Sequence, residues 1–253
     1  MRKVVFGGNW KMHGTWKQTE EYLQHFVNCP LPVNSEIILF VPFPYLSLMQ
    51  KTLSGTQIRI GAQNMHSEDK GAFTGEVSAD MLVDMGCTHV LIGHSERRSL
   101  FFEKGPFLNS KVKKALTKGL TPMYCIGETL AERESDKTVS VLQSQIREGL
   151  EGLSQDDIAK MYFAYEPVWA IGTGVNASEE DARSGIAVVR EAIASMSSSS
   201  VSQSVPIVYG GSVKTGNIAS YMAHKEVDGG LVGGASLKAE DFYLLIQAGM
   251  QGR

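Results

Sequence analysis

The chain has 253 residues, 43% of them hydrophobic and 20% charged, and its 24 Lys and Arg against 27 Asp and Glu give a formal net charge of −3. This balance excludes a protein that binds nucleic acid or an anionic membrane through a broadly basic surface. Because α/β barrels of about this length commonly fold around one core, we expect a single domain over residues 1–253.

Eight short apolar segments rich in β-forming residues recur along the chain, at residues 4–6, 37–41, 58–60, 89–92, 122–126, 161–165, 205–209 and 230–232. Nearly continuous apolarity is typical of strands buried on both faces of a parallel sheet that helices cover. Segments with helical spacing lie between them, for example residues 16–27, 107–116, 139–153 and 179–194. These units predict an α/β fold, a (β/α)8 barrel of eight parallel strands with an outer ring of helices, whereas a doubly wound sheet usually has fewer strands. We interpret the serine-rich residues 195–204 as a solvated loop.

Asn9 and Lys11 follow the first predicted strand, in the sequence FGGNWK over residues 6–11. In such barrels the chemistry sits at the carboxyl ends of the strands. A lysine there could hold a phosphate or stabilise an oxyanion, although a lysine simply exposed in a loop is the more ordinary interpretation. The two glycines before it favour a site, because they let the backbone approach closely.

His94 ends the fourth predicted strand and runs into Ser95 and Glu96, a plausible capped start of a helix. The amide dipoles of a helix N-terminus disfavour added positive charge, so a histidine held there stays neutral and donates a hydrogen bond. The alternative is a histidine satisfied by backbone partners. Its place at a strand end distinguishes His94 from the other histidines of the chain.

Glu166 ends the sixth predicted strand and precedes PVWAIGTGVNA over residues 167–177. A carboxylate covered by apolar groups and stripped of water can act as a general base near neutrality. The segment after it begins with proline and contains two glycines, as a hinged apolar lid would need. A surface carboxylate is the alternative. Residues 172–177 also fit the dinucleotide pattern GxGxxA, but five residues separate its first glycine from the strand, which makes this match weak.

Glycine turns follow the seventh and eighth predicted strands, at residues 210–212 and 233–236. Backbone N–H groups at such turns form an anion site without basic side chains, and loops after strands seven and eight bind phosphate in many barrels. The alternative is that these glycines only form tight turns, an explanation that is acceptable for one of the two segments but less so for both. A Walker loop is absent, because Val213 rather than glycine precedes Lys214.

The three cysteines, Cys29, Cys87 and Cys125, lie far apart and predict neither a disulfide framework nor a zinc site. No apolar run reaches membrane length, and Val4–Trp10 is too short for the core of a signal peptide. We therefore expect a cytoplasmic protein without metal, nucleic-acid or membrane partners.

Five segments, NWK at 9–11, GHSERR at 93–98, 164–174, YGGS at 209–212 and LVGGA at 231–235, together resemble the signature segments of the triosephosphate isomerase family. The likeness spans the whole chain in the right order. It implies the interconversion of dihydroxyacetone phosphate and D-glyceraldehyde 3-phosphate through an enediol(ate), in glycolysis and gluconeogenesis, by an enzyme without a cofactor.

The resemblance also implies a role for each matching residue. Glu166 matches the base, His94 the neutral electrophile, and Lys11 the cation that holds the substrate, with Asn9 beside it and Glu96 as a supporting carboxylate. The N–H groups that hold the phosphate would come from Gly172, Ser212, Gly233 and Gly234.

The family pattern further includes a loop over residues 63–76 that reaches into a partner subunit, so the resemblance implies a homodimer through Gln63–Glu76. Two positions depart from the pattern: Val175 stands where the family often has lysine, and Phe102 where glycine is usual. These departures concern the hinge of the lid and the packing near the dimer loop.

Two other functions fit part of this pattern. A Schiff-base aldolase on the same barrel would need a buried lysine near the sixth strand, where this chain has Glu166. A non-catalytic phosphosugar-binding barrel would keep the glycine turns but has no need of Glu166 and His94.

Overall fold

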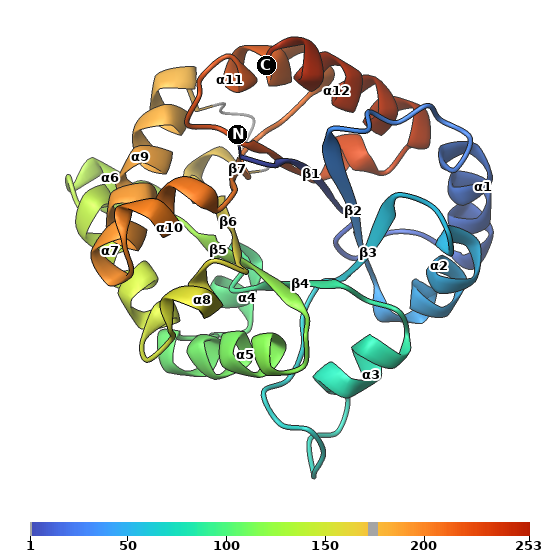
Figure 1. The fold of residues 1–253 in the computed structure, drawn as a ribbon, viewed down its shortest axis with the longest axis horizontal. Coiled ribbons are helices and arrows are strands. Elements are labelled where there is room, and N and C mark those ends of the chain that lie inside the picture. The colour runs from blue at the N-terminus through green and yellow to red at the C-terminus, as the bar shows by residue number, and fades with distance from the viewer. Residues whose placement is uncertain (1, 172–176) are drawn as a thin grey trace.

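The computed structural model describes residues 2–171 and 177–253. Eight parallel strands close into a barrel in which each strand pairs with the next and β8 pairs with β1 (Figure 1). The strands are β1 (Val4–Asn9), β2 (Ser35–Val41), β3 (Ile58–Ala62), β4 (His89–Ile92), β5 (Thr121–Ile126), β6 (Tyr162–Tyr165), β7 (Ile207–Tyr209) and β8 (Gly229–Val232). The predicted (β/α)8 barrel is therefore confirmed.

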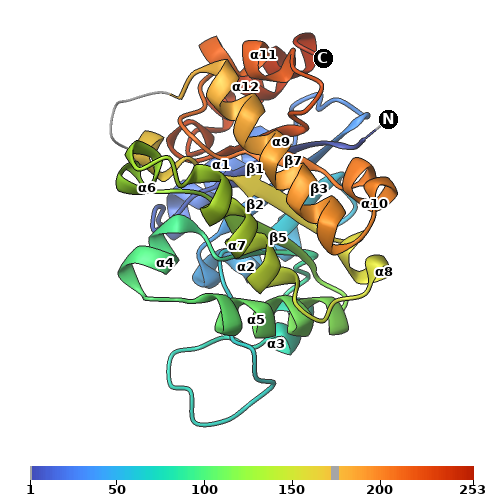
Figure 2. The same cartoon turned by 90° about the vertical axis from the view of Figure 1, so that its left-hand side faces the viewer.

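Helices form a ring around the barrel, as Figures 1 and 2 show. They are α1 (Trp16–Phe26), α2 (Leu46–Leu53), α3 (Ala79–Asp84), α4 (Ser95–Leu100), α5 (Gly105–Thr117), α6 (Leu130–Glu134), α7 (Thr138–Leu150), α8 (Gln155–Ile158), α9 (Glu179–Met196), α10 (Ser199–Ser204), α11 (Thr215–Met222) and α12 (Ala239–Gln251). Short 3-10 helices are η1 (Phe43–Tyr45), η2 (Val168–Ala170) and η3 (Gly234–Ser236). Among the described residues, no helix is long and apolar enough to cross a membrane.

The serine-rich segment 195–204 is not the solvated loop that its composition predicted. Helix α9 continues to Met196, and Ser199–Ser204 form α10, whose first turn is capped by the side chain of Ser198. Ser202 is buried, and its hydroxyl donates to the carbonyl of Arg190 at 2.6 Å. The serines therefore satisfy helix ends and a buried contact, which composition alone does not reveal.

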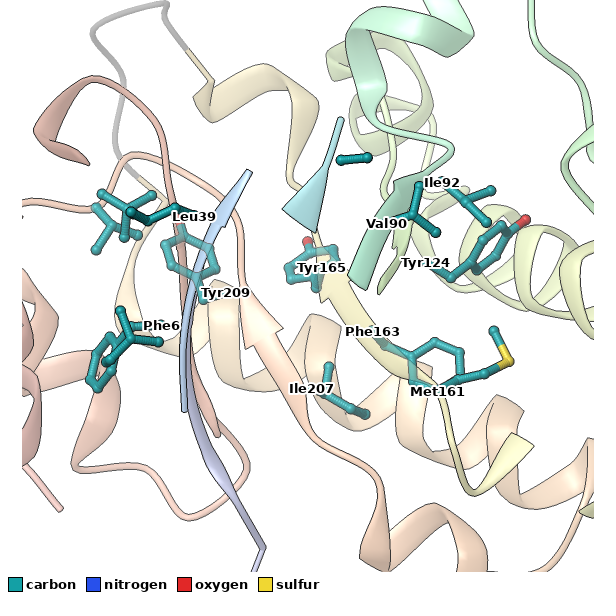
Figure 3. Packing of buried hydrophobic residues seen from close by; sticks show 14 of the residues in the cluster. Phe6, Leu39, Val90, Ile92, Tyr124, Met161, Phe163, Tyr165, Ile207 and Tyr209 are labelled. Atoms are coloured by element: carbon teal, nitrogen blue, oxygen red, sulfur yellow. The ribbon is translucent and has the colours of Figure 1, made fainter. Parts of the chain in front are cut away.

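Two hydrophobic layers hold the barrel together. The strands send one set of side chains inward, including Ile38, Phe40 and Leu91, and the other set outward against the helices. Figure 3 shows part of the outer layer, with Phe6 and Phe163 buried among its neighbours. Each such apolar side chain contributes roughly 1.5–3 kcal/mol on burial, so both faces of every strand stabilise the fold.

Glycines of β1 and β3 serve this packing. A Cβ on Gly7 would lie 3.0 Å from the ring of Phe40, and one on Gly61 would lie 2.3 Å from it. The glycines therefore make room for Phe40 inside the barrel. The glycine pair before Asn9 was expected to let the backbone approach something closely, and at Gly7 the close neighbour is this aromatic ring.

The segment between β3 and α3 extends away from the barrel as a long loop (Figures 1 and 2). Phe73 in this loop is 43% exposed. The loop includes residues 63–76, for which the family resemblance implies a contact with a partner subunit.

Candidate active site

The carboxyl ends of the strands surround a cavity of about 430 Å³. Its lining includes the side chains predicted to carry the chemistry, Asn9, Lys11, His94 and Glu166, together with the glycine turns after β7 and β8. Residues far apart in the sequence thus meet at one mouth of the barrel, as the strand order requires.

Lys11 is held in an uncommon backbone conformation just after β1. Its φ angle is +51°, in the left-handed region that residues other than glycine rarely adopt. The main-chain N–H of Lys11 donates to the side chain of Asn9 at 3.0 Å, and its carbonyl accepts from Gln63 at 2.9 Å. Because such strain persists only where neighbours enforce it, these contacts fix the direction of the lysine side chain.

The ammonium group of Lys11 forms an ion pair with Glu96 at 2.6 Å. Glu96 belongs to the first turn of α4 and is itself partly exposed. The carboxylate therefore holds the lysine from the rim of the cavity.

His94 precedes α4 as its N-cap and is 6% exposed. Its Nδ1 atom accepts from the main-chain N–H of Glu96 at 3.3 Å. A nitrogen that accepts a hydrogen bond carries no proton, so the neutral ring has its proton on Nε2. Nε2 lies 3.1 Å from the Oε1 atom of Glu166.

Glu166 follows β6 and is 1% exposed. Its Oε2 atom accepts from the main-chain N–H of Ser95 at 2.9 Å, whereas Oε1 has no aligned hydrogen-bond partner among the described residues. A buried carboxylate oxygen without a donor is costly unless something else satisfies it. This oxygen is therefore the one available to take a proton from a molecule in the cavity.

The main chain around Glu166 is joined closely to the segment after β5. The N–H of Glu166 donates to the carbonyl of Ile126 at 2.7 Å. A Cβ on Gly127 would lie 1.7 Å from the carbonyl oxygen of Glu166, so only glycine fits there. This close approach fixes the start of the segment that carries the carboxylate.

The glycine turns after β7 and β8 form another part of the cavity wall. Ser212, Gly233 and Gly234 line the cavity, and Gly233 and Gly234 begin η3. N–H groups at the start of a helical turn attract anions, which suits a phosphate at this wall. Gly172, the fourth residue predicted to bind phosphate, lies outside the described residues, as do Val175 and the rest of residues 172–176 of the predicted lid.

Two supporting residues escaped the sequence analysis. Gln63, assigned there to the dimer loop, directs its amide to the carbonyls of Lys11 and Phe40, at 2.9 and 3.0 Å, and so supports the Lys11 turn. Ser95 contributes its main-chain N–H, and the residue type at a position does not indicate what its backbone will bind. The position of Gln63 just after the third strand was the one signal that could have identified it.

A second, larger hollow of about 600 Å³ lies between α1 and the start of α12, and its lining includes His13, Glu21 and His25. It contains none of the four convergent side chains of the first cavity. Over residues 2–171 and 177–253, no group of three His, Cys, Asp or Glu side chains is arranged to hold a metal ion. The chemistry-bearing residues therefore point to the first cavity.

Comparison with known proteins agrees with this geometry. A family model described as triosephosphate isomerase matches residues 4–249. The triosephosphate isomerase of Dictyoglomus thermophilum is 45% identical over 249 residues, which cover 98% of this chain and 100% of that protein. Those of Caldanaerobacter subterraneus subsp. tengcongensis and Alkaliphilus metalliredigens are 46% identical over 246 residues and 47% identical over 242, covering 97% and 96% of this chain and 99% and 98% of theirs.

Proposed function

This chain belongs to the triosephosphate isomerase family, and on that premise we propose that Glu166, His94 and Lys11 carry out the reaction. The chain is an aldose–ketose isomerase that interconverts dihydroxyacetone phosphate and D-glyceraldehyde 3-phosphate, a step of glycolysis and gluconeogenesis. The reaction needs a base, a hydrogen-bond donor for the carbonyl oxygen and a site for the phosphate.

Glu166 takes the proton from carbon 1 of dihydroxyacetone phosphate through its Oε1 atom. The electrons of the broken C–H bond form the double bond between carbons 1 and 2, and the carbonyl electrons move onto the oxygen of carbon 2. Glu166 then returns the proton to carbon 2, while the hydroxyl proton of carbon 1 passes to the oxygen of carbon 2. The products of these transfers are the aldehyde and a regenerated carboxylate.

His94 and Lys11 stabilise the enediolate between the two transfers. The Nε2–H group of His94 is the donor for the developing oxyanion, because Nδ1 is already occupied by the N–H of Glu96. Lys11 supplies positive charge beside the oxyanion and the phosphate, and Asn9 and Glu96 hold it in place. Ser212, Gly233, Gly234 and Gly172 supply N–H groups for the phosphate.

One observation carries this assignment. The free Oε1 oxygen of Glu166 and the Nε2 atom of His94 lie 3.1 Å apart in the same cavity, where one substrate can contact both. A phosphosugar-binding barrel has no need for this pair, and a Schiff-base aldolase would need a lysine in place of the glutamate.

The direct test is conversion of glyceraldehyde 3-phosphate to dihydroxyacetone phosphate by the purified protein, in chelator and without added nucleotide. Rapid turnover is the expected result, and it would also show that the protein needs neither a metal nor a redox cofactor. Phosphosugar binding without turnover would instead support a binding protein.

We also propose a homodimer through the loop around Gln63–Glu76. The support is the projecting loop, with its half-exposed Phe73, and an apolar hollow of about 430 Å³ beside the active site, lined in part by Met12, Phe43 and Phe101. A loop from a second copy would cover apolar surface of this kind. Sedimentation equilibrium of the purified protein should give twice the chain mass of 27.6 kDa.

A cytoplasmic location and a single domain over residues 1–253 complete the proposal. The three cysteines are free thiols, which suits a reducing compartment. All eight strands belong to one closed barrel, which supports a single folding unit. Fractionation of the native cells and a single cooperative unfolding transition would test the two statements.

A further inference from the structure

Arg133 belongs to the short helix α6, which Figure 1 labels. Its side chain contacts those of Glu128, Trp169 and Asp181. Its guanidinium carbon lies 4.4 Å from the centre of the Trp169 ring, and its Nη1 atom lies 3.4 Å from a carboxylate oxygen of Glu128. Its Nη2 atom donates to the Oδ1 atom of Asp181 in the first turn of α9. One cation therefore joins residues from the segments before and after residues 171–177.

Glu128 connects Arg133 to the segment that carries Glu166. The Glu128 carboxylate is fully buried and accepts from the indole N–H of Trp169 at 2.9 Å and from the hydroxyl of Tyr165 at 3.1 Å. The main-chain carbonyl of Glu128 accepts from the N–H of Val168 at 3.1 Å. These bonds hold residue 165 and residues 168–169, which lie on either side of Glu166 in the chain.

A buried carboxylate is stable only when it is paired or fully hydrogen-bonded. Arg133 is the cation that the structure places against Glu128. Because the planar guanidinium also stacks on the indole, it limits the orientations that Trp169 can adopt while the indole N–H remains bonded to Glu128.

Asp181 is the other end of this connection. It closes a capping box with Ser178, whose N–H and hydroxyl donate to its Oδ2 atom at 2.9 and 2.7 Å. Burial alone would raise the pKa of Asp181, but the hydrogen bonds from Ser178 and the charge of Arg133 lower it, so the carboxylate is ionised when it meets the arginine. Oδ1 remains for Arg133, and the arginine is thereby attached to the start of α9.

We propose that Arg133 is a positioning residue for the isomerisation, which joins the Glu166-bearing turn through Glu128 and Trp169 to the start of α9 through Asp181. The inference rests on the proposed function of Glu166. It gives Arg133 no contact with the substrate. The arginine acts by keeping the turn that carries the proposed base in one place relative to the start of α9.

The test compares kcat and KM of Arg133→Met, Arg133→Lys and Asp181→Asn with the wild-type protein. Arg133→Met should lower kcat by about 10-fold to 100-fold and change KM less than about threefold, since displacing a reacting group by about 1 Å costs on that order. Arg133→Lys keeps the charge but loses the planar stacking, so its loss should be smaller. Adding Asp181→Asn to Arg133→Met should lower kcat little further, because the link is already broken.

Arg183→Met is the matched control, because Arg183 is a partly exposed arginine on α9 that pairs with Glu180 at 2.8 Å. Its kcat should equal that of the wild-type protein. A kcat for Arg133→Met within twofold of wild type would overturn the proposal, whatever the variant's melting temperature. Should Arg133→Met fail to fold, unchanged kcat in both Arg133→Lys and Asp181→Asn would overturn it.

Acrylamide quenching of tryptophan fluorescence separates this inference from the proposed function. In a Trp16→Phe background the remaining tryptophans are buried Trp10 and the partly buried Trp169, so a change reports on Trp169. Arg133→Met should increase quenching, and unchanged quenching would contradict the proposal that Arg133 holds the Trp169 ring in place. Absence of isomerase turnover in the wild-type protein would overturn the proposed function. The quenching measurement would then still show whether Arg133 holds Trp169 in place.

Discussion

The main-chain N–H of Ser95 donates to the Oε2 atom of Glu166 at 2.9 Å, so the start of α4 holds the carboxylate that follows β6. The two residues are 71 positions apart in the sequence. This bond occupies one oxygen of Glu166 and leaves the other facing His94. The position of the proposed base is thus set by a partner on a different strand–helix unit.

Shortening the base by one methylene should separate binding from catalysis. In Glu166→Asp the carboxylate withdraws by about 1.5 Å, the length of one C–C bond. We expect kcat to fall by about 100-fold or more while KM changes only a few-fold, because the phosphate wall is untouched. Steady-state kinetics in both directions measure this. Full turnover in Glu166→Asp would contradict the assignment of Glu166 as the base. Glu21→Asp, at an exposed position, is the control and should keep the wild-type kinetics.

A methyl group placed against the base should have a similar but weaker effect. A Cβ on Gly210 would lie 2.9 Å from the Cγ atom of Glu166. Gly210→Ala should displace the carboxylate and lower kcat by about 10-fold, with less loss of stability than of activity.

Gly216→Ala provides the comparison on α11. Nothing lies within 4 Å of a Cβ at Gly216, and the residue is inside a helix, so alanine there should raise stability by about 1 kcal/mol and leave kcat unchanged. Equal kinetics for the two glycine variants would show that the space beside Glu166 does not matter.

The sequence predicted the parts of this protein that depend on local pattern. The apolar runs identified the strands, and their carboxyl ends pointed to His94 and Glu166. The links made by Arg133 and Gln63 depend on which units lie side by side in the barrel and on how each side chain is turned. No pattern within one segment contains that information.

The same reason hid a polar layer at the opposite mouth of the barrel. The side chains of Glu36, His89 and Tyr162 meet there, although they come from β2, β4 and β6. Tyr162 donates to Glu36 at 2.5 Å, and Lys3 forms an ion pair with Glu36 at 3.1 Å. From the sequence, His89 was only one of the histidines without a distinguishing place.

This layer makes stability depend on pH. Burial lowers the pKa of His89 to about 4, mainly because the charged ring would lose water, and nearby Glu36 offsets this only in part. The unfolded chain keeps a histidine pKa of about 6.5, so between these values the unfolded state binds the proton and the folded state does not. Stability from this residue is therefore full above pH 6.5 and is lost as the pH falls.

The loss from His89 should reach about 2 kcal/mol between pH 7.5 and pH 5. Urea unfolding at several pH values across that range measures this loss. The free energy of unfolding of His89→Phe should fall by about 2 kcal/mol less than that of the wild-type protein over the same range. His13→Phe, at an exposed position, should keep the wild-type dependence. Identical pH profiles for wild type and His89→Phe would contradict the burial of a neutral ring.

Phe102 is one of the two positions at which the sequence departs from the family pattern. Its φ angle is +56°, and its side chain is 77% exposed. A bulky residue in the left-handed region costs roughly 1–2 kcal/mol, whereas glycine adopts this region freely but loses roughly 0.5–1 kcal/mol more backbone entropy on folding. Because the exposed ring contributes little in the single chain, Phe102→Gly should raise the free energy of unfolding by about 0.5–1 kcal/mol.

The neighbouring Phe101→Gly is the control, because Phe101 has an ordinary φ angle of −111° and its ring stacks with Arg97 at 4.5 Å. That variant should be less stable than wild type by about 1 kcal/mol or more, since it loses the ring contact and gains no relief of strain. Urea unfolding should be compared at protein concentrations that give all three proteins the same oligomeric state, because both rings lie near the proposed dimer surface. A Phe102→Gly protein no more stable than wild type would mean that the ring contributes as much in the assembled protein as its backbone strain costs.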